Sequence, residues 1–220
     1  MNTAQLYDLL STGFVDTLWI ILGSSLIAYV FGFPLGVLVT LTGKDGLYPK
    51  PVLSLGLNRA INIFRSIPFY ILVVALMPLS RFFVGTSLGI KATIFSLSVG
   101  AIPFVARLVE SALLEVDSDM IESVITMGAS KLQIVTKVLL REALPQLIQG
   151  LSITMIMLVG YSAMAGLMGG GGLGDIAIRY GYYRYNYTIM YYALIILIVL
   201  VEVIQTSVGL FVKYIDKRNK

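Results

Sequence analysis

Long apolar runs with few charges divide the chain into segments of membrane length. Because a bilayer core of roughly 30 Å needs about 20 helical residues, each such run predicts one membrane-spanning helix. Glu202 is the single charge in the last run, whereas Arg65 and Arg81 bracket the second, which extends back toward Pro51. The pattern predicts an all-α polytopic membrane protein with five transmembrane helices, at residues 17–43, 51–81, 82–106, 143–174 and 185–212.

The first residues lack the pattern of a secretory signal peptide. Asp8 and Asp16 are present and no basic residue precedes Lys44, so the positively charged start of such a peptide is missing. Apolar residues near helical spacing predict that this segment is a helix; they are Leu6, Leu9, Leu10 and Phe14. The helix either lies in the membrane interface or supplies the first turns of span one.

Composition agrees with a membrane protein and narrows the chemistry. Charged residues make up 13% of the chain and hydrophobic ones 57%, whereas soluble domains carry about 25% charged residues. The absence of cysteine excludes disulfides. The absence of histidine removes Ser-His-Asp chemistry and the commonest metal ligand. These absences argue against an enzyme, and we expect neither a metal nor a cofactor bound by this chain.

The basic residues predict the orientation in the membrane. With the N-terminus outside and the C-terminus in the cytoplasm, twelve of the sixteen fall on or near the cytoplasmic side, as the positive-inside rule requires. The twelve are Lys44, Lys50, Arg59, Arg65, Arg107, Lys131, Lys137, Arg141, Lys213, Lys217, Arg218 and Lys220. The tyrosine-rich segment 180–187 then lies outside, where it is typical of an aromatic belt, and we expect no nucleic-acid partner.

A glycine-rich stretch after span four contains G-x-G-x-x-G. A dinucleotide site would need a preceding strand and an acidic residue about 20 positions later, yet a membrane-length segment precedes and no acid follows Asp175 until Glu202. The glycines end the helix and permit backbone conformations closed to other residues. We expect either a flexible helix-ending loop or an external substrate entrance, formed by Gly169, Gly170, Gly171, Gly172 and Gly174.

The loop between spans three and four, residues 115–145, carries two capped helices. Asp119 and Glu122 have the spacing of an N-cap and a first-turn acid, and the helix they begin should end before Gly128. Ser130 and Gln133 form a capping box that opens a second helix. Its expected apolar stripe is Leu132, Val135, Val138 and Leu139. Capped helices with apolar faces outside the membrane predict a partner that covers them.

This loop resembles the EAA loop of bacterial ABC importer permeases. That pattern is Glu-Ala-Ala, three residues, Gly, nine residues, then Ile, any residue and Leu-Pro. Glu122 and Gly128 match in register, Val138 stands for Ile, and Leu140 matches, whereas Ser123-Val124 and Arg141 depart from the pattern. The resemblance implies a type I importer fold in a single permease domain over residues 1–220. The ATPase-coupling residues would be Asp119, Glu122, Ser123, Met127, Gly128, Ala129 and Ser130.

Further segments resemble the methionine importer permeases. They are Arg65-Ser-Ile-Pro-Phe69, Gly160-Tyr-Ser-Ala-Met164 with the glycines after it, and Tyr180-Gly-Tyr182. The resemblance implies import of D- and L-methionine through the bacterial inner membrane by a homodimer of this chain. It also implies two separate ATPase subunits that hold ATP and Mg²⁺, and an external methionine-binding lipoprotein.

The candidate translocation pathway draws on spans two and four. Tyr161, Ser162 and Met164 lie between Gly160 and Gly166, which thin the helix, and the subfamily resemblance adds Arg65, Ser66 and Pro68. A contact between Arg65 and Glu202 is a further possibility, with packing or snorkelling as the alternative. Two other functions stay open: an ion-coupled secondary transporter that uses Glu202, and a permease of the same class for another amino acid.

Overall fold

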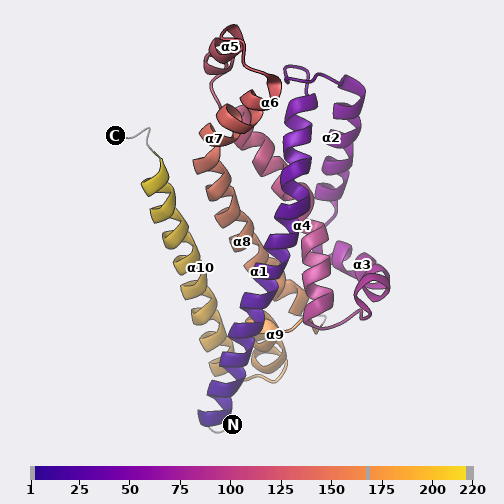
Figure 1. The fold of residues 1–220 in the computed structure, drawn as a ribbon. Helices are drawn as coiled ribbons and strands as arrows, with labels where there is room; N and C mark the ends of the chain where they lie inside the picture. Colours follow the sequence, from indigo (N-terminus) through magenta and orange to yellow (C-terminus); the bar gives the residue numbers. More distant parts are fainter. Residues whose placement is uncertain (1–2, 167–168, 217–220) are drawn as a thin grey trace.

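The computed structural model describes residues 3–166 and 169–216, and every regular element in this part is a helix. Four helices are long and apolar enough to cross a membrane, and a bent pair gives a fifth span if its two helices count as one. The expected all-α fold is confirmed. In Figure 1 the four long helices run side by side between two ends of the bundle. They are α1 (Thr3–Thr42), α4 (Ile90–Leu114), α8 (Leu144–Gly166) and α10 (Tyr187–Ile215).

The first helix runs unbroken from Thr3, so the N-terminal segment supplies the first turns of span one and is not a separate interfacial helix. Helix α1 makes its most extensive contact with α4. Gly32 and Gly36 allow this contact, because a Cβ atom on either would lie within 3 Å of a backbone carbonyl oxygen of α4. Small residues that let two helices approach closely are typical of membrane bundles.

The second predicted span is two helices joined by a sharp elbow. Helices α2 (Pro51–Ser66) and α3 (Phe69–Val84) are bent by 105° at Ile67 and Pro68. Pro68 disfavours a helical conformation for the residue before it, and Ile67 is extended, with φ −78° and ψ 124°. Proline also lacks the N–H that would continue the helix. The predicted second span is therefore broken at Ile67 and Pro68.

The predicted limits of the third span are wrong, because they were set by the positions of charged residues. Residues 82–84 end α3, and Gly85 terminates that helix in a left-handed conformation. Helix α4 starts at Ile90 and continues past Arg107 to Leu114. Arg107 lies inside this helix, where Glu110, one turn later, forms an ion pair with it. A paired charge does not have to leave the apolar segment.

Short helices lie at the two ends of the bundle (Figure 1). At the end of the bundle toward which α1 and α10 run lies α5 (Ser118–Thr126), followed by α6 (Lys131–Gln133), the π-helical turn η1 (Ile134–Leu139) and α7 (Leu140–Glu142). At the opposite end, near the start of α1, lie α9 (Gly172–Ile176) and the π-helical turn η2 (Ala177–Tyr182). We call these the α5 end and the α9 end.

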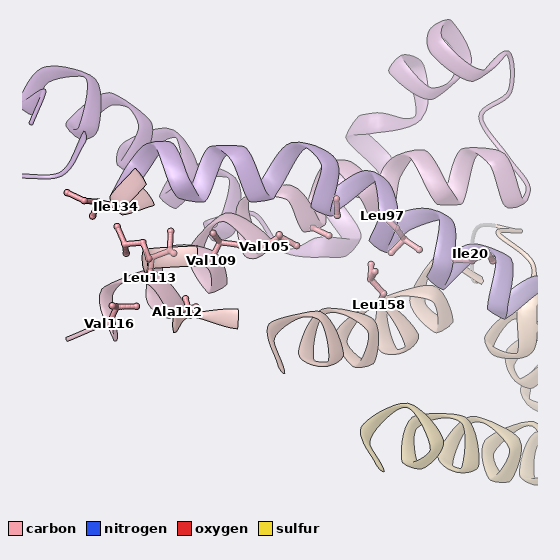
Figure 2. Packing of buried hydrophobic residues seen from close by; sticks show 13 residues of the cluster. Ile20, Leu97, Val105, Val109, Ala112, Leu113, Val116, Ile134 and Leu158 are labelled. Atoms are coloured by element: carbon pink, nitrogen blue, oxygen red, sulfur yellow. The ribbon is translucent and has the colours of Figure 1, made fainter. Parts of the chain in front are cut away.

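The main apolar core follows the α1–α4 contact and extends toward α5 (Figure 2). Leu97, Val105 and Val109 of α4 are fully buried in this core. Ile20 of α1 and Leu158 of α8 are also fully buried and belong to the same cluster. Ile134 and Leu139 join the same cluster from η1. One continuous core therefore connects the membrane helices to the base of the 115–145 loop.

Candidate functional site

Helix α5 stands out from the bundle at its end (Figure 1). No residue of this helix is buried, and the side chain of Met127 just after it is 83% exposed. The N-cap is Asp117, whose side chain accepts a hydrogen bond from the backbone N–H of Asp119 over 2.9 Å. The expected helix is confirmed, but its cap lies two residues earlier than predicted, and Asp119 occupies the first turn instead.

The glycine after α5 is required by its backbone conformation. Gly128 has φ +80°, in the left-handed region that residues with a Cβ rarely adopt. Its N–H donates to the carbonyl of Ile125, and that of Ala129 to the carbonyl of Val124, which closes the C-terminus of α5. The capping box is also confirmed: Ser130 accepts from the Gln133 N–H, and the Gln133 side chain accepts from the Ser130 N–H.

The sequence-predicted coupling residues thus form one exposed surface around the α5–α6 turn. Glu122, Ser123, Met127, Gly128 and Ser130 are exposed, and Ala129 is half-buried. Lys131 fixes this turn to the loop between α1 and α2, since its Nζ donates to the Leu47 carbonyl over 2.6 Å and lies over the Tyr48 ring. The surface is therefore held in place by the rest of the chain while its outward side stays open.

The apolar stripe predicted for the second helix is confirmed at Leu139 and wrong at Leu132, while Val135 and Val138 are half-buried. Leu132 is 69% exposed, whereas Ile134 and Leu139 are buried. Ile134 and Leu139 begin and end η1, a π-helical turn in which hydrogen bonds join residues i and i+5, so that residues five apart lie on a similar face.

Two of the predicted pathway residues meet at the elbow. Arg65 and Tyr161 both line a pocket of about 230 Å³ beside Ile67. The ring of Tyr161 stacks on that of Phe69, with centroids 4.0 Å apart and planes inclined by 8°. The other lining residues are Phe64, Leu72, Gly100, Phe104 and Met157. We call this the elbow pocket; it combines one guanidinium group with aromatic rings and a thioether.

The other predicted pathway residues do not line the elbow pocket. Ser162 is buried and donates to the carbonyl of Val159, and Met164 is exposed at the far end of α8. Ser66 donates to the carbonyl of Asn62 within α2. Pro68 shapes the pocket indirectly by forming the elbow.

Sequence reasoning missed the lining residues Phe69, Phe104 and Met157. Met157 could have been found, because it precedes Tyr161 by four positions and so shares its helix face. Phe104 comes from another span, and Phe69 reaches the pocket through the elbow. Neither contact has a signal in a single sequence.

The glycine-rich segment is packed into the α9 end. The Thr17 hydroxyl of α1 accepts a hydrogen bond from the Leu173 N–H over 2.8 Å, and the Thr93 hydroxyl of α4 donates to the Gly170 carbonyl over 3.2 Å. Gly172 has φ +85°, and a Cβ there would lie 2.8 Å from the Thr17 hydroxyl oxygen. These contacts argue against the alternative of an unconstrained helix-ending loop.

An ion pair follows at the same end of the bundle. Arg179 contacts Asp175 over 3.0 Å, and Asp175 is largely buried. Burial raises the pKa of the Asp175 carboxyl, and the Arg179 guanidinium opposes that shift. The positive charge of Arg179 therefore compensates the buried carboxylate of Asp175 beside the glycines.

Within one chain, Glu202 does not contact Arg65. The ion pairs formed among the described residues are Arg107–Glu110 and Arg179–Asp175. Glu202 lies exposed on α10, whereas Arg65 is in the last turn of α2, on the other side of the bundle (Figure 1). The proposed contact between the two side chains is therefore wrong for the single chain.

The sequence and the fold were compared with known proteins. A model of the family described as "Binding-protein-dependent transport system inner membrane component" matches residues 32–220. A probable D-methionine transport system permease protein of Vibrio cholerae is 48% identical over 211 residues, which are 96% of this chain and 94% of that protein. The methionine import system permease protein of Bacillus subtilis is 42% identical over 181 residues, 82% of each chain.

A solved structure gives the same result. A chain of the MetNI methionine ABC transporter in an inward-facing conformation matches 99% of this chain and 100% of its own length. The TM-score is 0.95 and the sequence identity 45%. The family model and these full-length similarities establish that this chain belongs to the family of inner membrane components of binding-protein-dependent transport systems.

Proposed function

We propose that this chain is the membrane-spanning subunit of an ATP-driven importer of methionine. The observation that carries the proposal is the full-length similarity to methionine permeases and to a chain of a solved methionine transporter. The elbow pocket supports the same substrate. Its aromatic rings suit a thioether sulfur, which makes favourable contacts with ring edges, and Arg65 offers a planar fork that matches a carboxylate.

The ATPase subunits would bind at the exposed surface around α5. Its apolar side chains Met120, Ile125 and Met127 are exposed outside the membrane helices, and a partner that covers them would remove this surface from water. ATP and Mg²⁺ would be held by that partner. Asp119, Glu122, Ser123, Gly128, Ala129 and Ser130 would form the rest of the contact.

A second copy of this chain would cover the polar side of α10. Gln205 and Lys213 line a cleft of about 340 Å³ between α8 and α10, together with Gln149 and Ser152 of α8. Polar groups at this depth are costly against lipid and normally face protein or a water-filled cavity. In a homodimer built around a central pathway, these polar groups would face protein or water rather than lipid. The exposed Glu202 on the same helix would also be kept away from lipid.

The proposed mechanism is alternating access. When two ATPase subunits close on ATP, they would move α5, and α5 would move α4, to which it is joined by three residues. The pathway would then open toward the α9 end, where an external methionine-binding lipoprotein delivers substrate past Gly169, Gly170, Gly171, Gly172 and Gly174. Ser66, Pro68, Ser162 and Met164 would flank the path. The N-terminus would face outward and the C-terminus the cytoplasm.

Uptake of labelled methionine tests this function in cells that lack their own methionine importer. The test variant is Gly128→Val and the matched control is Gly85→Val. Both glycines end a helix with φ near +80°, and a Cβ on either meets nothing within 4 Å, so the backbone strain is alike and only the position differs. We expect wild type and Gly85→Val to restore uptake, and Gly128→Val to abolish it at equal membrane abundance.

The other outcomes decide between the alternatives. If Gly128→Val imports as well as the control does, ATPase coupling through this turn is refuted, and a requirement for an ion gradient would identify the secondary transporter. If wild type with its partners imports another amino acid but not methionine, the permease class stands and the substrate is wrong.

A further inference from the structure

Helix α2, which carries Arg65 into the elbow pocket, is attached to the bundle by few apolar contacts. Only one of its residues, Ile61, is buried. Ile61 packs in a small cluster with Val39 of α1 and Ala106 of α4. A helix that buries a single side chain depends on its remaining contacts for its position.

One such contact is polar and comes from α4. The guanidinium group of Arg107 forms an ion pair with Glu110 through Nη1 and donates a hydrogen bond through Nη2 to Asn62 Oδ1, over 2.9 Å. The Arg107 and Glu110 side chains are 23% and 15% exposed. The carbonyl of Asn62 in turn accepts from the hydroxyl of Ser66 over 2.8 Å. The contact therefore fixes the last turn of α2, directly before the elbow.

The position of Arg107 on α4 lies between two functional regions. Phe104, one turn before it, lines the elbow pocket. Glu110, one turn after it, lines a cavity of about 460 Å³ that Ile121 of α5 also lines. One turn of helix advances about 5.4 Å, so Arg107 lies within one turn of both regions. Its side chain therefore connects the part of α4 that faces α5 to the end of α2 beside the elbow pocket.

We propose that Arg107 is a positioning residue that makes α2 follow α4. When α5 moves α4, the hydrogen bond to Asn62 would carry the end of α2, and with it Arg65, in the same direction. The rigid fork of arginine holds Glu110 and Asn62 at once, which a single ammonium group does not do in the same geometry. The inference rests on the proposed function of the chain as an ATP-coupled importer.

The experiment removes the acceptor rather than the arginine, because Asn62 is exposed and its loss leaves the Arg107–Glu110 pair intact. The purified complex of this chain with its ATPase is reconstituted in lipid vesicles, and methionine uptake per ATP hydrolysed is measured for Asn62→Ala. Asn62→Asp keeps an acceptor for Arg107. Asn58→Ala is the matched control, since Asn58 lies one turn earlier on α2 and its side chain bonds only to Ser54 of the same helix.

We expect Asn62→Ala to hydrolyse ATP at the wild-type rate and to import about tenfold less methionine per ATP, as loss of a hydrogen bond to a charged group would give. Asn62→Asp and Asn58→Ala should keep the wild-type ratio. An unchanged ratio in Asn62→Ala overturns the proposal. So does an equal loss in Asn58→Ala, which would indicate a general weakening of α2.

A second measurement does not depend on the substrate. The chain has no cysteine, so Ile63→Cys, at an exposed position of α2, gives a single site for maleimide on this subunit. The labelling rate should differ between the nucleotide-free complex and the complex trapped with ATP and vanadate, and Asn62→Ala should abolish that difference. A difference that persists in Asn62→Ala, or that never arises, refutes the role of Arg107. Failed methionine uptake alone would refute only the proposed substrate.

Discussion

Replacement of Gly36 by alanine should loosen the contact between α1 and α4 and lower the stability of the protein. A Cβ at Gly36 would lie 2.5 Å from the carbonyl oxygen of Ala106 and 2.7 Å from the Cβ of Val109. Neither atom is the flexible end of a side chain. To reach an ordinary contact of 3.4 Å, the helices must separate by roughly 0.9 Å, and a gap of that size already forfeits a quarter to a half of the dispersion energy at the atoms concerned.

The magnitude follows from the extent of this contact. Overpacking a well-packed core costs about 1–3 kcal/mol, and we expect about 2 kcal/mol here because α1 and α4 form the largest helix pair of the fold. For a chain of this size that cost lowers Tm by roughly 4–8 °C. The assay is the loss of the monodisperse peak on size exclusion after heating in detergent.

The matched control for this prediction is Gly56→Ala on α2. Gly56 is also helical, but a Cβ there meets nothing within 4 Å, so the same substitution tests the effect of the methyl group without the clash. Alanine should leave Tm unchanged or raise it slightly, because alanine is the better helix former by about 1 kcal/mol. Equal Tm values for Gly36→Ala and Gly56→Ala would refute the close α1–α4 approach.

Two further substitutions test the pocket and the α9 end. Arg65→Gln should raise the methionine concentration for half-maximal uptake about tenfold or more, with little change in ATP hydrolysis, because a charge-assisted hydrogen bond to the carboxylate is lost. Concentration-dependent uptake in vesicles measures this value. An unchanged value would remove Arg65 from the substrate site. Thr17→Val should lower the free energy of unfolding by about 1–3 kcal/mol, because the buried Leu173 N–H loses its acceptor. The control is Thr40→Val, because the Thr40 hydroxyl donates to the Gly36 carbonyl of its own helix. Thermal melting compares the two variants, and equal melting temperatures would contradict the prediction.

The features that the sequence predicted correctly depend on neighbours along the chain. The capping box needs only Ser130 and Gln133, three positions apart, and the end of α5 needs only a glycine that accepts a positive φ. Membrane spans likewise follow from local composition. Most of the exposed α5 surface could therefore be predicted before the fold was known; the N-cap, which is Asp117 and not Asp119, is the exception.

The elbow pocket could be predicted only in part, because its walls come from three helices. Arg65 and Tyr161 were identified separately, but hydropathy alone does not show that α3 turns by 105° and brings Phe69 against Tyr161. The π-helical turn at Ile134 is a similar case. It changes the period of the helix at a place where the apolar pattern is too short to show it.

The two errors in the predicted spans fall on the same part of the molecule. Hydropathy did not reveal the break at Pro68, and the charge of Arg107 ended the third span too early, yet the structure joins α2 and α4 through Asn62 and Arg107, just before that break. Places where local rules fail are expected at functional sites, since a bend or a charge in an apolar segment must be compensated. Here the compensation is a polar contact next to the elbow pocket. The coincidence of both failures with the pocket is what favours a functional role for the α2–α4 junction over simple packing.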